Sequence, residues 1–231
     1  ISHQYHGAHA IDHLCEPTLV ALNKRIGGFE NEIYMVTLAP EISGSLELIK
    51  RLRSLDILVA LGHSGANSKQ SSICFEQGVS MLTHTLNAMP GIEHRAPGPV
   101  GEALLKGDIA LGLIADGVHV SSTVAVLLQR LASHQLVLVS DALSPYGLGE
   151  GQHEWDQRTI FVKNGSCRLA DGTLAGVTLP LLEGCKRLSQ WGGEPSASIW
   201  SSTIAPRRVL KRNKGCNDVD FLVGQSLKKL L

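Results

Sequence analysis

The chain has 231 residues, of which 43% are hydrophobic, and its 21 basic side chains balance its 21 acidic ones. This size and apolar content allow one large hydrophobic core or two modest ones. There is no long run of like charges and no apolar run near the roughly 18 residues of a membrane span, so we expect no nucleic-acid or membrane partner and a cytoplasmic location.

Short apolar segments alternate along the chain with segments of helical periodicity, as in a βα repeat. The expected strands are residues 33–41, 57–63, 79–84, 109–119 and 136–142, and the helices between them are 45–55, 69–78, 100–107 and 121–133. Five apolar strands in this order predict an α/β fold, with a parallel sheet and helices packed against it.

The pattern changes after residue 142. Residues 144–176 contain many glycines and a hairpin signal at Asn164-Gly165, which would place a flap beside the sheet. Helices are expected at 179–191 and 197–212, and a final short strand at 218–224. The five cysteines have no C-x-x-C spacing, which favours free thiols over disulfides or a thiolate metal site.

Every expected strand of the parallel sheet ends in polar residues. They are Glu41, His63, His84, Asp116 with His119, and Asp141. A single histidine or aspartate after a strand is more often a helix cap or a turn residue. The carboxyl ends of parallel strands, however, lie on one edge of the sheet, so five such endings together indicate an active site.

His63 and His84 are 21 residues apart at the ends of consecutive strands, so their imidazoles can share a divalent metal ion. Zinc suits such ligands, with iron, manganese or cobalt as alternatives, and a catalytic site usually adds a third protein ligand and a water. Asp141 would act as the general base on that water. The residues therefore favour hydrolysis of an amide or a related C–N bond.

Eight short motifs follow one another in an order that resembles the N-acetylglucosamine-6-phosphate deacetylases of the amidohydrolase superfamily. They are HGAH (6–9), VTLAPE (36–41), GHSGA (62–66), THTLNAM (83–89), HRAPG (94–98), ADGVH (115–119), SDA (140–142) and LAG (174–176). The resemblance implies a metal-dependent hydrolase that converts N-acetylglucosamine 6-phosphate to glucosamine 6-phosphate and acetate. It also implies that His63 and His84 are metal ligands and that Asp141 is the catalytic acid and base.

The resemblance further implies substrate-binding residues, which are His9, Asn87, Ala88, Arg95, His119 and Leu174. Arg95 and His119 match the pair that grips the 6-phosphate, and charge-assisted donors suit a phosphate dianion. In the family the arginine comes from the neighbouring subunit, so a homodimer is expected. His9 matches a contact to the sugar or its acetyl carbonyl, and Leu174 borders the acetyl group.

The resemblance implies a (β/α)8 barrel of which about five of the eight strands are present. The family's third metal ligand is a glutamate in an H-x-E-G-P strand end, just before the segment that matches the start of this chain at Ile1. That ligand and three strands are expected upstream. Residues 1–212 would then be a partial barrel, and 213–231 a remnant of a small β domain.

Two alternatives stay open. One is an inactive, truncated relic or a sugar-phosphate-binding remnant, because two histidines without a carboxylate hold metal weakly. The other is a related amidohydrolase that acts on a cyclic amide or on a different N-acyl sugar. The phosphate pair of Arg95 and His119 argues against this second alternative.

Overall fold

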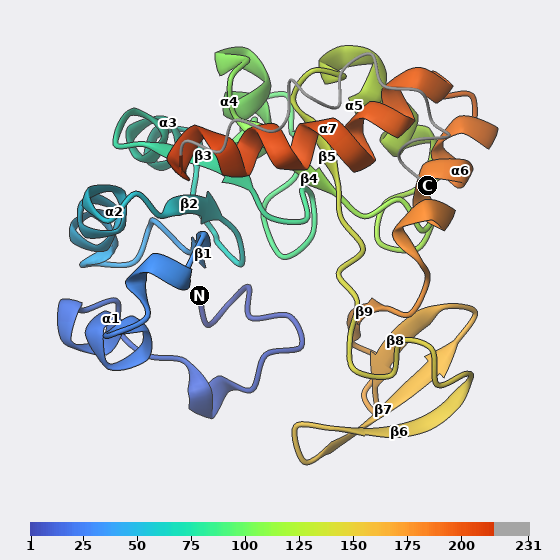
Figure 1. The fold of residues 1–231 in the computed structure, drawn as a ribbon, viewed down its shortest axis with the longest axis horizontal. Coiled ribbons are helices and arrows are strands. Elements are labelled where there is room, and N and C mark those ends of the chain that lie inside the picture. The colour runs from blue at the N-terminus through green and yellow to red at the C-terminus, as the bar shows by residue number, and fades with distance from the viewer. Residues whose placement is uncertain (215–231) are drawn as a thin grey trace.

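A computed structural model describes residues 1–214. Its main element is a five-stranded parallel sheet in the order β1-β2-β3-β4-β5 (Figure 1). The strands are Met35–Leu38 (β1), Leu58–Leu61 (β2), Val79–Leu82 (β3), Ala110–Leu113 (β4) and Leu136–Leu138 (β5). The predicted parallel sheet is confirmed. Its strands are shorter than expected because the polar residues at their carboxyl ends belong to loops.

Helices connect consecutive strands on one face of the sheet. They are Ser45–Ser54 (α2), Ser68–Glu76 (α3), Gly98–Lys106 (α4) and Ser122–Ala132 (α5), all within or close to the predicted segments. Asn67 and Gln70 form a capping box that starts α3, and the Ser121 hydroxyl accepts a hydrogen bond at the start of α5. Helix α1 (Leu19–Ile26) and two short 3₁₀ turns, Ile11–His13 and Glu30–Glu32, precede the sheet.

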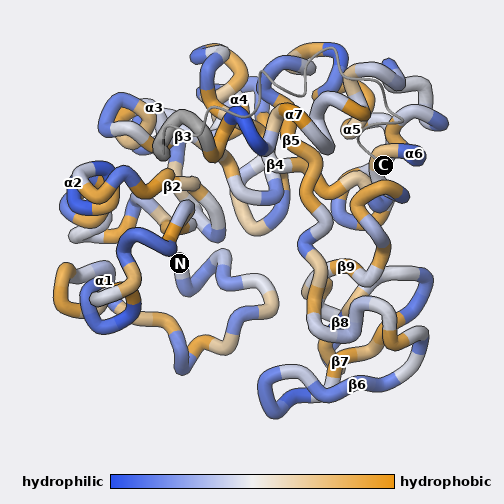
Figure 2. Tube along the Cα trace, viewed as in Figure 1, coloured by the Kyte–Doolittle hydropathy of each residue, from blue (hydrophilic) through white to orange (hydrophobic). Residues whose placement is uncertain are grey.

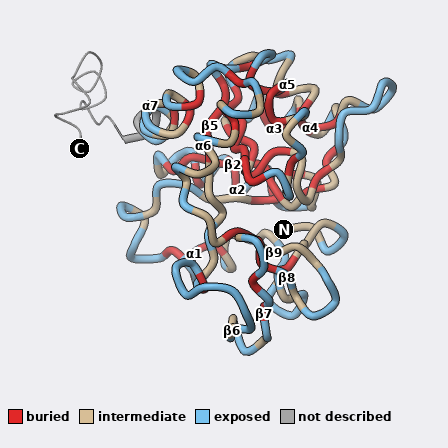
Figure 3. Tube along the Cα trace, turned by 90° about the vertical axis from the view of Figure 1, so that its right-hand side faces the viewer, coloured by how far each residue is buried: buried red, intermediate tan, exposed pale blue. Residues whose placement is uncertain are grey.

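Both faces of the sheet are covered. Alternate strand residues such as Leu61 and Leu111 point toward the connecting helices and form the larger core with them. The opposite face carries Leu58, Met81 and Val137, and helix α7 (Pro195–Lys214) packs across it. Helix α6 (Leu181–Gln190) leads into α7. Figure 3 shows most of the buried segments in this sheet and its helices, and Figure 2 shows hydrophobic segments there and also in other parts of the chain.

A second sheet is antiparallel, with the strands Gly151–Trp155 (β6), Arg158–Lys163 (β7), Ser166–Leu169 (β8) and Leu174–Val177 (β9). Asn164-Gly165 forms the two-residue turn from β7 to β8, with positive φ at both residues. The predicted hairpin is therefore confirmed, and it is part of a larger sheet than the expected flap. The strand expected at 218–224 lies outside the described residues.

Within residues 1–214 no helix combines the length and apolar character that crossing a bilayer requires.

Candidate active site

A cavity of about 400 Å³ lies at the carboxyl edge of the parallel sheet. Its walls come from the N-terminal segment 4–9, from the loops after β2 to β5, and from the small antiparallel sheet. Figure 1 shows these three parts around the edge of the sheet. The predicted site residues that line the cavity are His9, His63, His84, Asn87, Ala88, His119, Asp141 and Leu174.

The two histidines after β2 and β3 face each other. Their Nε2 atoms are 2.9 Å apart, and their ring centroids are 4.7 Å apart. His63 Nδ1 lies 2.9 Å from the Tyr5 carbonyl oxygen. Because a carbonyl only accepts hydrogen bonds, this nitrogen carries the proton, and the lone pair of His63 is on Nε2, toward His84.

Both histidines of this pair are neutral near pH 7. Burial, followed by the neighbouring His84, lowers the pKa of His63 to about 4. Burial also lowers the pKa of His84, although the Asp141 carboxylate acts in the opposite direction. Neutral imidazoles are the form that binds a metal ion.

The pair fits two positions of a divalent metal site. Two imidazoles bound at about 2.0–2.1 Å to one tetrahedral ion have nitrogens about 3.3 Å from each other. The observed spacing is 2.9 Å, so a small outward shift of the rings would admit the ion. His84 Nδ1 is buried and has no hydrogen-bond partner among the described residues. Residues 1–214 contain no cluster of three or more His, Cys, Asp or Glu side chains that could hold an ion, so no third side chain of these types joins the pair within the described residues.

The backbone at these positions is unusual. His63, His84 and Asp141 have φ angles of 49°, 29° and 52°, in the left-handed region that costs a non-glycine residue about 1 to 3 kcal/mol. Such strain is typical of functional sites, where the surrounding structure holds the residue in place. The three residues that the sequence assigns to the chemistry thus share this backbone conformation, which Leu86 and Ala88 in the loop after β3 also adopt.

Glycine allows the strands to approach closely just before His63. A Cβ on Gly62 would lie 2.7 Å from Thr83 Cβ and 2.9 Å from Thr37 Cγ2. The two threonine hydroxyls are hydrogen-bonded at 2.9 Å across this position. Any side chain at Gly62 would therefore push apart the neighbouring strand ends that carry the two histidines.

Glu41 belongs to the predicted rim but does not line the cavity. Its carboxylate accepts hydrogen bonds from the Ser64 hydroxyl at 2.7 Å and from the Gly65 N–H at 2.6 Å. The Ser64 N–H donates to the Ala88 carbonyl at 3.0 Å, which joins this loop to the one after His84. Glu41 therefore holds the loop that carries His63.

Asp141 is tied to the small sheet. Its backbone carbonyl accepts a hydrogen bond from the Val177 N–H at 3.0 Å. A Cβ on Gly176 would lie 2.7 Å from the same carbonyl oxygen, so this close approach requires glycine. The position of Asp141 thus depends on β9 as well as on β5.

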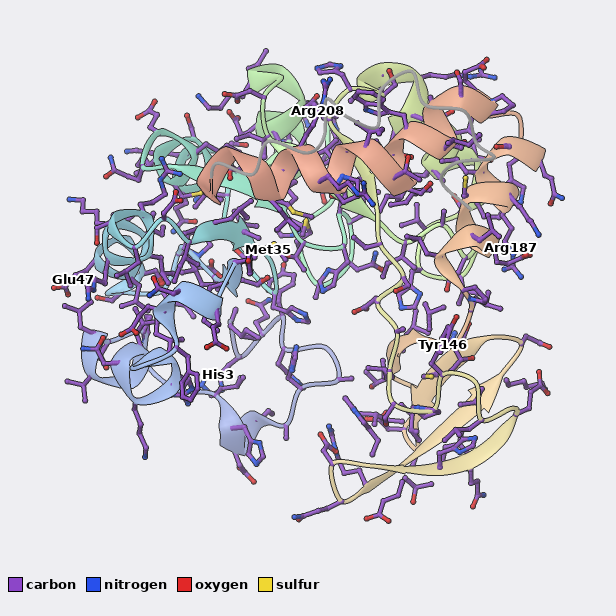
Figure 4. All side chains as sticks on the ribbon, in the orientation of Figure 1. His3, Met35, Glu47, Tyr146, Arg187 and Arg208 are labelled. Atoms are coloured by element: carbon purple, nitrogen blue, oxygen red, sulfur yellow. The ribbon has the colours of Figure 1, made fainter. Side chains whose placement is uncertain are left out.

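His119 is oriented by Asp116, at the end of β4. One Asp116 oxygen accepts from the N–H groups of Val118 and His119, and the other from His119 Nδ1 at 2.7 Å. Burial raises the pKa of Asp116, but these hydrogen bonds outweigh it and leave the pKa below its usual value. Arg187 of α6 (Figure 4) donates to the Asp116 carbonyl at 2.7 Å.

Arg95 is the one predicted site residue that does not line the cavity. It is exposed in the loop between β3 and α4, beside an antiparallel bridge between Glu93 and Ala96. Sequence reasoning missed seven lining residues, which are Gln4, Tyr5, Gly7, Ala8, Leu143, Trp155 and Ala175. The hairpin signal at Asn164-Gly165 and the expected place of Leu174 beside the acetyl group were the indications that the small sheet approaches the site.

No protein-family model matches the chain. It is 38% identical over 203 residues to an N-acetylglucosamine-6-phosphate deacetylase of Bacillus subtilis, covering 84% of this chain and 51% of that protein. It is 34% identical over 234 residues to the enzyme of that name from Bos taurus, covering 96% and 56%. An N-acetylgalactosamine-6-phosphate deacetylase of Escherichia coli O157:H7 is 33% identical, with 90% and 55% covered.

Solved structures of N-acetylglucosamine-6-phosphate deacetylases are similar to the chain in fold. The N-acetylglucosamine-6-phosphate deacetylase of Thermotoga maritima matches this chain with a TM-score of 0.84 at 33% identity. The matched region covers 92% of this chain and 58% of that protein's chain. A mutant Mycobacterium smegmatis enzyme of the same name, in complex with N-acetyl-D-glucosamine-6-phosphate, has a TM-score of 0.85 at 27% identity, with 91% and 57% covered.

The fold and the histidine-lined cavity place the chain in the α/β class, with five strands of a (β/α)8 barrel of the amidohydrolase type, as predicted. Within this class the chain is related to the N-acetylglucosamine-6-phosphate deacetylases, which confirms the resemblance that the motifs indicated. The chain spans about half the length of the curated relatives that it matches.

Proposed function

We propose that the protein hydrolyses the acetamide of N-acetylglucosamine 6-phosphate to give glucosamine 6-phosphate and acetate. The observation that carries this proposal is the convergence of His63, His84 and Asp141 on one cavity that also contains the predicted sugar-binding residues. N-acetylgalactosamine 6-phosphate is a second candidate substrate, favoured by the similarity to the Escherichia coli protein named for it.

His63 and His84 would hold a divalent ion through Nε2, with zinc as the first choice and iron, manganese or cobalt as alternatives. When bound, such an ion supplies Lewis-acid chemistry and makes a water a better nucleophile at neutral pH. The Tyr5 carbonyl contributes by keeping the proton of His63 on Nδ1.

Asp141 acts as the base and then as the acid. Its carboxylate accepts a proton from the water whose oxygen bonds to the acetyl carbon. The C–N bond then breaks, the electron pair stays on nitrogen, and Asp141 returns the proton to the departing amine. His9, Asn87, Ala88, His119 and Leu174 position the substrate around these atoms, with His119 held by Asp116.

A deacetylation assay on the purified chain with zinc tests this proposal. We expect Asp141→Asn to lower turnover by about 10²- to 10⁴-fold, because the proton transfers are lost, while zinc affinity is retained. Asp12→Asn, an exposed residue away from the cavity, is the matched control. Retained activity in Asp141→Asn would reject the assigned base. Substrate binding without turnover in the wild type would favour the inactive remnant, and hydrolysis of amides without phosphate would favour a different substrate class.

We propose further that Arg95 binds the 6-phosphate in the cavity of a second copy, in a homodimer. Its exposure outside its own cavity supports this role. Mixing Arg95→Ala and Asp141→Asn subunits, each impaired alone, should restore about a quarter of the wild-type activity, because random dimers rebuild one complete site in half of the pairs. No restoration after subunit exchange would contradict a shared site.

A further inference from the structure

The cavity has an apolar wall beside Asp141. It consists of Leu143, Trp155, Leu174 and Ala175, which come from the small sheet and from the segment that leads into it past Tyr146 (Figure 4). Leu143, Trp155 and Ala175 also pack against the buried cluster of Ile160, Val162 and Cys167. This wall is therefore supported from behind by the core of the small sheet.

The apolar wall is fastened next to Asp141. The Val177 N–H donates to the Asp141 carbonyl at 3.0 Å, and the Leu143 N–H donates to the Val177 carbonyl at 3.2 Å. The backbones of Asp141 and Leu143 are thus both hydrogen-bonded to Val177 of β9. The apolar wall therefore begins directly beside the backbone of Asp141.

Trp155 contacts Arg158, a residue of the neighbouring strand that also bonds to the N-terminal segment. The Arg158 guanidinium lies 4.8 Å from the centroid of the indole ring. Arg158 forms two hydrogen bonds with Asp156, at 2.7 and 2.6 Å, and its Nη2 donates to the Ala8 carbonyl at 2.9 Å. Because Ala8 belongs to the N-terminal segment, this bond ties the β6–β7 turn to the opposite side of the site.

We infer that Trp155, with Leu143 and Leu174, bounds the acyl group and limits the substrate to a short acyl chain. This inference rests on the proposed function. In an acetamide the methyl group is one bond from the carbon under attack, so it is the apolar part of the substrate nearest to Asp141. Each further methylene would extend toward the indole ring, which Arg158 contacts.

Binding and hydrolysis of N-acetyl-, N-propionyl- and N-butyrylglucosamine 6-phosphate test this inference. Calorimetry should show that the zinc-loaded wild type binds the acetyl compound at least about tenfold more tightly than the butyryl compound. Trp155→Ala should reduce this preference by about tenfold or reverse it. Phe161→Ala, at a half-exposed aromatic residue of the same sheet that does not line the cavity, should keep the wild-type preference.

Trp155→Leu keeps an apolar contact with the small sheet and serves as a second variant if Trp155→Ala does not fold. An equal weakening of all three ligands by either substitution would overturn the inference. Binding with acyl selectivity but without hydrolysis would reject the proposed function and keep the inference. Hydrolysis with the same acyl selectivity in the variants as in the wild type would reject the inference and keep the proposed function. A folded chain that binds none of the three would reject both.

Discussion

At the scale of single residues, the site depends on hydrogen bonds that hold a strained backbone. His63 is fixed at its ring by the Tyr5 carbonyl and at its carbonyl by the Ser2 N–H, and Asp141 is fixed by the Val177 N–H. These partners come from distant parts of the chain. The candidate ligands and the base are therefore positioned mainly by residues that do not take part in the chemistry.

Glu41 is the partner whose removal should be most informative. Glu41→Ala leaves the Ser64 hydroxyl and the Gly65 N–H without their acceptor, so the loop that carries His63 loosens. We expect zinc affinity to fall by about 10- to 100-fold, measured by calorimetry. Glu47→Ala on the exposed side of α2 is the control. A lower unfolding free energy with unchanged zinc affinity would show that Glu41 has only a structural role.

Asp116 should make the stability of the metal-free chain depend on acid pH. Its folded pKa lies below the ordinary 3.8, so its stabilising effect is complete above that value and is lost as the pH falls through the lower folded pKa. Asp116→Asn should lower the free energy of unfolding by about 1 to 2 kcal/mol at pH 7, as seen in urea titrations. The difference should shrink below pH 4, and a constant difference would contradict this account.

Sequence reasoning found the residues that follow apolar runs, because such endings are local signals. His63, His84 and Asp141 are of this kind, and the structure brings them to one cavity. Tyr5 and Trp155 have no comparable signal. They reach the site through contacts made by a polar N-terminal segment and by a polar strand, and no local pattern encodes those contacts.

At the scale of elements, helical periodicity predicted α2 to α5 well, and the sheet followed from their alternation with apolar segments. The small sheet was harder to predict, because β6 is mostly exposed and has no regular apolar alternation. Helix α1 was missed within the polar start, although Thr18 caps it. Helix α7 was expected, but its place across the sheet face that carries Leu58, Met81 and Val137 depends on tertiary packing.

The packing of α7 gives a prediction about stability. Trp200 of α7 packs against the apolar cluster on the sheet face opposite the connecting helices, and this cluster includes Met81 and Val137. Trp200→Ala should lower the free energy of unfolding by about 2 to 3 kcal/mol, in chemical denaturation. Ile199→Ala, at a side chain that is 48% exposed, should cost less than about 1 kcal/mol. Equal costs would mean that Trp200 does not anchor the helix.

At the scale of the whole molecule, the candidate site lies where three separate parts of the chain meet. The parallel sheet supplies the histidines and Asp141, the N-terminal segment supplies the Tyr5 carbonyl, and the small sheet supplies the apolar wall. The loops at the carboxyl edge of the sheet thus carry the candidate function, while the helix-covered faces carry most of the core.

The position of α7 also matters while the chain is being made. All five strands of the parallel sheet leave the ribosome before α7 does, so α7 does not yet cover the face that carries Leu58, Met81 and Val137 during that interval. Exposed apolar surface of this kind favours aggregation and chaperone binding. The arrival of α7 therefore covers apolar surface that would otherwise stay open to such contacts.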